Sequence, residues 1–507
     1  MKRLCVSLLM AAAICFGAPA QSALKNYVKE LCSNEPLKSS VWGVLAVRMN
    51  GDTLVAYNPL QKMVPASNTK LITTGMALNL LGADFKYHTA LAYSGEIVDS
   101  TLVGDVYIIG GGDPTLGSRS DCAIPIDRIF AQWQKSLMEA GIRMVSGRVV
   151  GDGRRMKWYG ENSGWGIDDL AWDYGAGVTA LNFYENTQDV YTAPGAAEGD
   201  PVDVSVIYPR TPWMTYIHSC TTGAAGTGDE ITYTNSEFVP VGEIRGTLAT
   251  DKGKRKQEFA NRFPALTCAY YFHNYLCDHA LPVDGGYADI APDGTVRSDF
   301  REGWWLHATG KQEAPGQDSL TVVGSTSSPA LKEIIKDCLY ESDNFYAEAL
   351  LKAIGQEMAE DPSYDSSLEA EKKLIEGAGV KLDGRAQIRD GSGLSRKNYI
   401  SPDFFVRFLR AMAASPEYDT YLHALPQPGK GTLEGRMSKA SESLQKRVWM
   451  KSGSMNGVRC YSGYITAEGG KPEDTIVFSV MTNNVTVPTY QVSLIMDKII
   501  TLIGESK

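Results

Sequence analysis

The sequence predicts a mixed α/β (α+β) fold. One antiparallel sheet flanked by helices is built from both ends of the chain, with a large β-rich region inserted between them. Three observations predict this. A strand hairpin and an apolar helical pattern occupy residues 42–81, and strand-like runs followed by an apolar helical pattern occupy 447–503. Between them, 88–315 contains short, evenly spaced strand patterns and few helical ones.

Length and composition limit the number of domains and the classes of binding partner that we expect. A chain of 507 residues is long enough for two or three domains, and 43% hydrophobic with 21% charged residues is typical of globular proteins. The net charge of −10, without a basic stripe, argues against a nucleic-acid partner. No run after the leader reaches the roughly 18 apolar residues of a membrane span. Asp497 and Lys498 interrupt the last apolar stretch, 490–503, which is therefore predicted to be a core helix.

Residues 1–20 have the pattern of a secretory signal. Lys2 and Arg3 precede an apolar run, and Ala18-Pro19-Ala20 forms a cleavage site. We therefore expect a secreted or periplasmic protein, whose formal charge changes from −10 to −12 when the leader is removed. Lipidation at Cys15 is not expected, because the bulky Ile14 precedes it.

The cysteines indicate no metal site. Two of the nine lie in the leader, which leaves an odd number, so not all can pair within the chain. No Cys-x-x-Cys or Cys/His ligand spacing occurs, and structural zinc is not expected. Cys268 and Cys277 are near enough in sequence to pair, but spacing does not decide whether they do.

The first elements have strong local signals. A short helix is predicted over 24–32, and strands over 42–49 and 53–57 flank an Asn-Gly turn, the strongest short-range hairpin signal. Ser67 opens a helix that continues through an apolar run and stops at Gly82, a natural C-terminal cap.

The middle of the chain is predicted to consist mainly of strands. Strands are predicted over 88–94, 105–109 and 148–151, and helices over 127–141 and 259–279. The Gly110–Thr115 cluster is interpreted as a turn, because no Gly-Lys-Ser/Thr follows as in a phosphate loop. Residues 183–255 show β-like alternation and could form a nested subdomain.

From 328 the pattern is helical again and ends in strands. Helices are predicted over 331–340, 344–355 and 401–413, and strands over 447–450, 459–465 and 475–482. We therefore expect 24–87 and 316–507 to form one discontinuous domain, with 88–315 inserted as one or two further domains.

Ser67 and Lys70 form the first chemical motif. On a helix, positions i and i+3 lie about 5–6 Å apart at Cβ, so the amine can reach the hydroxyl. A serine is a weak nucleophile until a base takes its proton, and a lysine acts as that base only when its pKa is lowered by burial or a nearby cation. Ser-x-x-Lys also occurs at Ser22 and Ser443, but only Ser67 is followed by an apolar helix.

Two polar clusters complete the motif set. Ser342-Asp343-Asn344 lies between two predicted helices, and Lys451-Ser452-Gly453 follows an apolar strand, where Gly453 leaves room for a ligand against the backbone. Together with Ser67-x-x-Lys70, this order resembles the three signature elements of serine β-lactamases and penicillin-binding proteins.

The intervals between the three motifs resemble those of one subgroup of these proteins. Ser342 follows Ser67 by 275 positions and Lys451 follows Ser342 by 109. The long first interval is similar to that of the class C low-molecular-mass penicillin-binding proteins, the D-alanyl-D-alanine carboxypeptidase/endopeptidases. Further similar stretches are Gly110–Leu116, Tyr174–Asn182, Asp390–Arg396 and Gly431–Leu433 with Arg436. Two departures are Ser452, where Thr is usual, and Gly177, where Pro is common.

The resemblance implies a β-lactamase/transpeptidase-like catalytic domain and a catalytic group of Ser67, Lys70 and Ser342. Ser67 attacks the penultimate D-alanine of a peptidoglycan stem peptide, Lys70 takes its proton, and Ser342 relays a proton to the departing amine. β-Lactams would be covalent inhibitors. No metal or cofactor is implied.

The resemblance also implies the binding group. Asn344 holds the peptide amide, Lys451 helps keep Lys70 neutral and attracts the substrate carboxylate, and Ser452 hydrogen-bonds that carboxylate. Gly453 lets the peptide approach, and the backbone N–H of Ser454 joins that of Ser67 in an oxyanion hole.

Two alternatives to a D,D-peptidase stay open. A β-lactamase would need a second base that the sequence does not place, and an inactive wall-binding protein would not need the intact motifs. A Ser-His-Asp hydrolase is disfavoured, because no Gly-x-Ser-x-Gly elbow occurs. The sequence does not decide between carboxypeptidase and endopeptidase, does not assign a role to the inserted region, and is compatible with a homodimer.

Overall fold

A computed structural model of the chain describes residues 26–31, 37–156, 160–236, 239–290, 294, 296–297 and 315–506. The predicted signal over 1–20 and Cys15 lie outside the described residues. The predicted early helix is present as a helical segment over 26–31.

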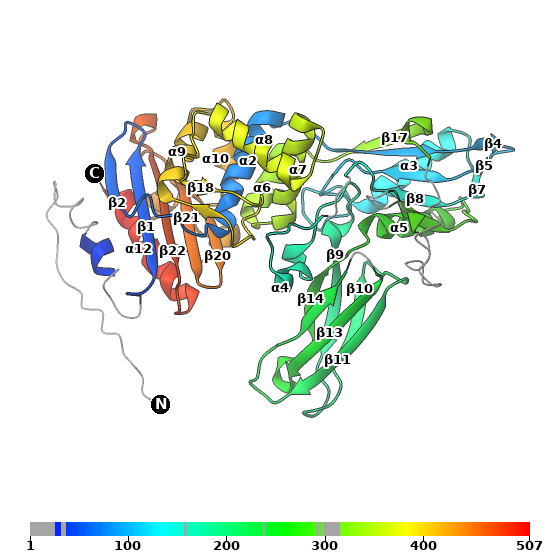
Figure 1. Ribbon diagram of the computed structural model, residues 1–507, viewed down its shortest axis with the longest axis horizontal. Helices are drawn as coiled ribbons and strands as arrows, with labels where there is room; N and C mark the ends of the chain where they lie inside the picture. The colour runs from blue at the N-terminus through cyan, green and yellow to red at the C-terminus, as the bar shows by residue number, and fades with distance from the viewer. Residues whose placement is uncertain are drawn as a thin grey trace.

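A five-stranded antiparallel sheet joins the two ends of the chain (Figure 1). Its order is β2-β1-β22-β21-β20. The strands are β1 (Val41–Arg48), β2 (Thr53–Tyr57), β20 (Val448–Met455), β21 (Val458–Ile465) and β22 (Ile476–Asn483). The predicted hairpin is confirmed, since β1 pairs with β2 around Asn50-Gly51. β20 is longer than the predicted 447–450, because its pairing with β21 continues from Lys451 to Met455.

Helices cover both faces of this sheet. On one face, α12 (Thr489–Glu505) buries Met496, Ile499 and Ile503 in a core shared with β1 and β22, which confirms the predicted C-terminal core helix. Each such side chain contributes roughly 1.5–3 kcal/mol when fully buried. The other face carries most of the remaining helices of this part (Figure 1). They are α2 (Lys70–Leu81), α6 (Leu331–Tyr340), α7 (Asn344–Ala359), α8 (Tyr364–Gly377), α9 (Pro402–Ala413) and α10 (Tyr418–Ala424). The short α11 (Glu442–Gln445) lies on the α12 face, where its Leu444 packs in the same core as α12.

The inserted region begins with a six-stranded mixed sheet. Its order is β16-β15-β8-β6-β3-β17, and α3 (Ile126–Glu139) and α5 (Pro264–Asp278) contribute to its core. The strands are β3 (His88–Tyr93), β6 (Val106–Ile109), β8 (Val149–Asp152), β15 (Tyr287–Ile290), β16 (Val296–Arg297) and β17 (Thr321–Ser327). A small sheet of β4 (Glu96–Val98), β5 (Thr101–Val103) and β7 (Met144–Val145) adjoins it.

Two three-stranded sheets extend from this region (Figure 1). One joins β10 (Asp203–Tyr208), β9 (Thr187–Ala193) and β14 (Arg255–Ala260), and the other joins β11 (Thr215–Gly223), β13 (Val241–Ala249) and β12 (Thr232–Asn235). Residues of both sheets share one apolar core. We propose that they form the nested subdomain, over 187–260.

Strand pairing bears on where the insertion ends. β17 pairs antiparallel with β3, although it lies beyond residue 315. We therefore propose 88–327, rather than 88–315, as the inserted region, with 24–87 and 328–507 as the discontinuous domain. The predicted helix over 259–279 is also corrected. Phe259 pairs with Gln188 inside β14, and α5 begins at Pro264, a residue favoured in the first helical turn.

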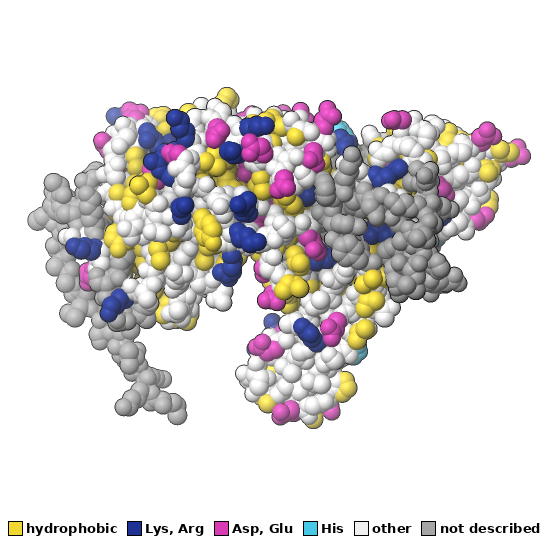
Figure 2. All heavy atoms as spheres, in the orientation of Figure 1, with side chains coloured by type: hydrophobic (Ala, Val, Ile, Leu, Met, Phe, Trp, Pro, Cys, Tyr) yellow, Lys and Arg dark blue, Asp and Glu magenta, His cyan; other side chains and the backbone are white. Residues whose placement is uncertain are grey.

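Surface and cysteines complete the description. On the face drawn in Figure 2, Asp and Glu side chains lie among the Lys and Arg side chains. Within the described ranges, no helix has the length and apolarity needed to cross a membrane. Cys268 is a buried free thiol and Cys277 an exposed one, so the pair considered from sequence is not formed.

Candidate active site

Ser67 and Lys70 meet where a short turn runs into a buried helix. Ser67 belongs to the 3-10 turn η1 (Ala66–Thr69), and Lys70 is the first residue of α2. Lys70 Nζ donates a hydrogen bond to Ser67 Oγ at 3.0 Å, and the lysine is fully buried. Ala66 has a φ of +47°, a conformation that is costly for non-glycine residues and concentrated at functional sites. The structure thus brings together the hydroxyl and amine that the spacing predicts to be in reach.

Two further acceptors surround the Lys70 amine. Its Nζ lies 2.6 Å from Asn344 Oδ1 and 2.9 Å from the Ser392 carbonyl oxygen. With Ser67 Oγ these make three acceptors, which matches the three N–H donors of an ammonium group.

Burial and charge act in opposite directions on Lys70. Burial lowers the pKa of the amine, because an ammonium loses its hydration in the interior. Four nearby groups that can carry negative charge oppose this shift: Cys338, Asp343, Glu348 and Asp390. The net direction is downward, toward the neutral amine that a general base requires.

The Ser342-Asp343-Asn344 segment joins α6 to α7. Asp343 caps α7 by accepting a hydrogen bond from the Tyr346 N–H at 2.8 Å, and Asn344 is the first residue of the helix. Asn344 Nδ2 donates to the Tyr174 carbonyl at 2.8 Å, which orients Oδ1 toward Lys70. Ser342 has a φ of +63°, the second left-handed non-glycine residue at this site.

Lys451, Ser452 and Gly453 lie on β20, at the edge of the five-stranded sheet. Ser452 Oγ donates to Thr432 Oγ1 at 3.0 Å, and Ser454, next along the strand, is exposed. A Cβ on Gly453 would lie 2.6 Å from the Pro65 carbonyl oxygen, so only glycine lets β20 approach η1 this closely. The strand and the Ser67 turn therefore form adjacent walls of one site.

Lys451 has fewer polar partners than Lys70. Lys451 is fully buried and donates to one neutral acceptor, the Ser452 carbonyl, at 2.8 Å. Burial, and then the charge of Lys70, lower the pKa of Lys451 well below its ordinary value. Because Lys70 has three acceptors and anionic neighbours, the unliganded site favours the positive charge on Lys70 rather than on Lys451.

Comparison with known proteins assigns the family. The sequence model of the D-Ala-D-Ala carboxypeptidase 3 (S13) family matches residues 24–287 and 302–503. The chain belongs to this family. The resemblance to class C penicillin-binding proteins is thereby confirmed, and so is the expectation of a serine-type D-Ala-D-Ala carboxypeptidase.

Individual relatives agree with this assignment. The S13 chain is 28% identical over 477 residues to the D-alanyl-D-alanine carboxypeptidase of Actinomadura sp. (strain R39), which covers 91% of this chain and 81% of the relative. It is 27% identical over 516 residues to penicillin-sensitive carboxypeptidase A of Dictyostelium discoideum, with coverages of 95% and 91%. The crystal structure of penicillin binding protein 4 (dacB) from Haemophilus influenzae matches with a TM-score of 0.75 and 21% identity, over 95% and 97% of the two chains. This structural match confirms the predicted fold.

Several contacts of this S13 site were not predicted from the sequence. The Ser392 and Tyr174 carbonyls and the Thr432 hydroxyl hold Lys70, Asn344 and Ser452, respectively. All three lie in stretches that resemble the family, which is the only sequence signal for them. A backbone carbonyl has no residue-type signature, so its role could not be assigned without the fold.

A cavity of about 230 Å³ adjoins Ser342 and Asn344. Its lining includes Arg119 and four acidic residues, Asp173, Glu185, Glu341 and Asp343. Burial raises the pKa of Asp343 to about 7 and that of Asp173 to about 6. This acidic cavity lies between the inserted region and the loop that carries Ser342.

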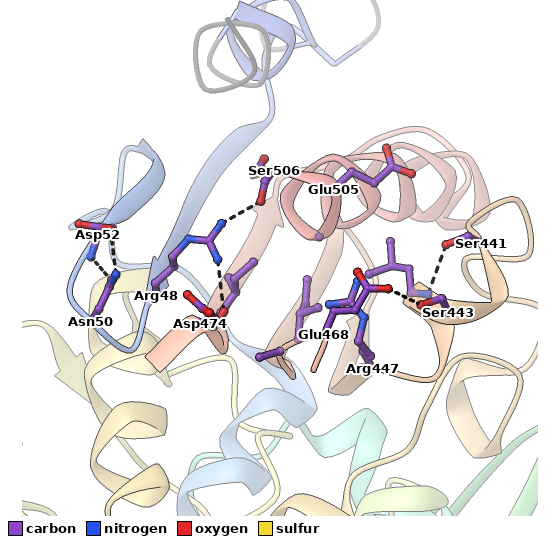
Figure 3. A pocket seen from close by; sticks show the side chains of 15 residues that line it. Arg48, Asn50, Asp52, Ser441, Ser443, Arg447, Glu468, Asp474, Glu505 and Ser506 are labelled. Atoms are coloured by element: carbon purple, nitrogen blue, oxygen red, sulfur yellow. Dashed lines mark hydrogen bonds between the residues drawn. The ribbon is translucent and has the colours of Figure 1, made fainter. Parts of the chain in front are cut away.

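A larger cavity of about 910 Å³ has a different lining (Figure 3). It lies near the C-terminal end of the chain and is lined by Arg48, Arg447 and Ser443 among others. None of the predicted site residues lines it. The exposed Ser443 agrees with the choice of Ser67 among the three Ser-x-x-Lys matches. Among the described residues there is no cluster of three or more metal-ligating side chains, and the absence of a metal stays a prediction.

Proposed function

We propose that this S13 chain is an exported serine D,D-peptidase that cleaves peptidoglycan stem peptides through an acyl-enzyme on Ser67. The contact of Lys70 Nζ with Ser67 Oγ at 3.0 Å, inside a buried site, carries the proposal. Ser67 Oγ attacks the carbonyl carbon of the penultimate D-alanine while Lys70 takes the hydroxyl proton. The peptide C–N bond then breaks, Ser342 relays a proton to the departing amine, and water hydrolyses the ester.

The binding roles follow from position. An extended peptide can lie along β20, because an edge strand offers unpaired backbone groups to a ligand. The substrate carboxylate interacts with Lys451 and Ser452, and its negative charge favours the ammonium form of Lys451. Asn344 holds the peptide amide, Gly453 provides room, and the N–H groups of Ser67 and Ser454 stabilise the oxyanion, each contributing about 2.7–4 kcal/mol elsewhere.

Penicillin labelling tests the acyl-enzyme. The name of the Dictyostelium relative, a penicillin-sensitive carboxypeptidase, supports β-lactams as covalent inhibitors of this chain as well. We expect one fluorescent penicillin to add to the mature chain in intact-mass analysis, on the peptide that carries Ser67, and none to add to Ser67→Ala. Label on another residue would overturn the proposal. Rapid release of the label would favour a β-lactamase, and wall binding without labelling or cleavage an inactive wall-binding protein.

Product analysis decides between the two peptidase reactions. A carboxypeptidase releases D-alanine from a stem peptide that ends in D-Ala-D-Ala, and an endopeptidase separates a cross-linked dimer at D-Ala–diamino acid. Mass spectrometry of purified stem peptides and dimers, incubated with wild-type protein and with Ser67→Ala, measures both. The leader predicted over 1–20 supports a secreted or periplasmic location for this reaction.

A further inference from the structure

A fully buried carboxylate, Glu348, supports the loop that contacts Lys70. Glu348 lies on α7, one helical turn after Asn344, so both side chains leave the same face of the helix. Its Oε1 accepts the Ser392 N–H at 2.8 Å and its Oε2 accepts the Gly391 N–H at 3.1 Å. The carboxylate therefore joins α7 to two successive peptide groups.

The same loop residue faces the catalytic lysine. The N–H of Ser392 points to Glu348, whereas its carbonyl accepts a hydrogen bond from Lys70 Nζ at 2.9 Å. Thr73, one turn after Lys70 on α2, donates to the Gly391 carbonyl at 3.0 Å. The loop is thus fixed between α7 and α2, and displacement of residue 392 would remove one of the three acceptors of the amine.

We propose that Glu348 is a positioning residue for acylation of Ser67, because it holds the Ser392 carbonyl against Lys70 Nζ. The inference rests on the proposed function, since it concerns the base of that reaction. Glu348 itself does not touch the nucleophile. Asp390, the neighbouring buried carboxylate, instead shapes the loop internally by accepting the N–H groups of Gly393 and Ser395.

The charge of Glu348 has a second consequence. The groups that face Lys70 are Cys338 from α6, Asp343 and Glu348 from α7, Asp390 from the loop, and Lys451 from β20. Burial raises the pKa of the Cys338 thiol to about 12, which leaves the three carboxyls as the anions. An ionised Glu348 raises the pKa of Lys70, so removal of this charge should lower it.

Glu348 has its own charged surroundings. The groups that face it are Asp390, Glu371 and Tyr364, and the buried cations Lys352 and Lys70. Burial, and then the charge of Asp390, raise the pKa of Glu348 to about 7, while the Ser392 side chain and the two loop N–H groups oppose the shift. The carboxylate is therefore the predominant form above neutral pH.

Two substitutions separate position from charge. Glu348→Asp keeps the anion but shortens the side chain, so it cannot hold both N–H groups. Glu348→Gln keeps the length but removes the charge and places an amide donor against one N–H. We expect each to slow labelling by a fluorescent penicillin by about 10²-fold, the order expected for a 1 Å displacement of a catalytic group. Only Glu348→Gln should also move the acidic limb of the pH–rate profile to lower pH.

Asp152→Asn is the matched control. Asp152 is also fully buried and accepts a backbone N–H, that of Arg154, at 3.0 Å, but it lies on β8 and is not among the groups that face Lys70 or Glu348. We expect its labelling rate to stay within about threefold of wild type and its pH limb to stay unmoved. Circular dichroism confirms folding of each variant, and Glu348→Asp keeps the test valid if Glu348→Gln does not fold. Wild-type rates in both Glu348 variants, or an equal loss in Asp152→Asn, would overturn the inference while leaving Ser67 labelling intact. An unlabelled wild-type Ser67 would instead overturn the proposed function, and the inference with it.

Discussion

Trp165 donates its indole N–H to the Asp390 carboxylate at 2.9 Å, although the two residues are 225 positions apart in the chain. Trp165 belongs to the inserted region, and Asp390 opens the loop whose Ser392 carbonyl contacts Lys70. Asn162 reinforces this link by donating to the Arg389 carbonyl at 2.7 Å. The inserted region therefore helps directly to shape the loop that contacts Lys70.

Replacement of Trp165 by Phe should destabilise this link. A hydrogen bond to a charged group contributes about 1.5–3 kcal/mol, so we expect a loss of that order in the free energy of unfolding, with slower penicillin labelling. Urea denaturation and the labelling rate measure the two effects.

Trp213→Phe is the control for the lost ring volume. Trp165 and Trp213 are both 8% exposed, but Trp213 Nε1 has no hydrogen-bond partner among the described residues. Its replacement should cost at least about 1 kcal/mol less and leave labelling unchanged. Equal losses in the two variants would contradict a specific role for the Trp165 hydrogen bond.

Local chemistry explains what the sequence could predict. The Asn50-Gly51 turn defines its hairpin with neighbouring residues alone, and the Ser67 helix has its apolar run and its Gly82 cap within one short segment. The start of α5 had a readable signal in Pro264, which the apolar pattern from Phe259 obscured.

Features that depend on pairing between distant segments could not be predicted from the sequence. β17 follows a long interval and pairs with β3, and no property of residues 321–327 identifies that partner. The acceptors of Lys70 show the same limit. Asn344 belongs to a motif and could be named, whereas Ser392 acts through a carbonyl whose direction depends on Glu348, Thr73 and the loop fold.

Ser452 tests the binding role of the β20 hydroxyl. Its Oγ lies 3.0 Å from Thr432 Oγ1, which orients it within the site. Loss of one hydrogen bond to the charged substrate carboxylate costs about 1.5–3 kcal/mol, so Ser452→Ala should lower kcat/KM for a peptide ending in D-Ala-D-Ala by about 12- to 160-fold. Ser452→Thr retains the hydroxyl and should stay near wild type. An unchanged kcat/KM in Ser452→Ala would show that the hydroxyl does not bind substrate.

The buried carboxyls predict a stability that decreases as pH rises. Burial raises the pKa of Glu371 to about 8 from its ordinary 4.5, and that of Glu348 to about 7. Between pH 4.5 and about pH 8 these carboxyls hold their protons in the folded state but lose them in the unfolded state. Their contribution to the free energy of unfolding is therefore fully present below pH 4.5 and is lost as the pH approaches 8. We expect the urea midpoint to fall between pH 5 and pH 8.

Glu371→Gln should reduce that pH dependence. The amide does not titrate, so its variant should lose less stability than wild type over the same interval. Glu442→Gln is the control, because Glu442 is exposed and its neighbour Lys446 lowers its pKa. An identical slope in wild type and Glu371→Gln would show that Glu371 ionises normally in the folded protein.

Gly393 tests how closely the loop that carries Ser392 must approach the turn that carries Ser67. It has a φ of +87°, and a Cβ there would lie 1.9 Å from the Ala66 carbonyl oxygen. Gly384 offers a matched position, with a φ of +76° but nothing within 4 Å of an added Cβ. Both Gly→Ala changes therefore carry the backbone cost of about 1–2 kcal/mol, but only one adds a collision.

The expected difference is in function rather than in strain alone. Gly393→Ala must displace either Ala66, which precedes Ser67, or the loop that carries Ser392, and an error of about 1 Å at a catalytic group can cost about 10²-fold in rate. We expect that loss in penicillin labelling of Gly393→Ala, whereas Gly384→Ala should label at the wild-type rate despite a lower unfolding midpoint. Equal labelling by both variants would show that the loop can move away from η1 without disturbing the contact between Lys70 and Ser67.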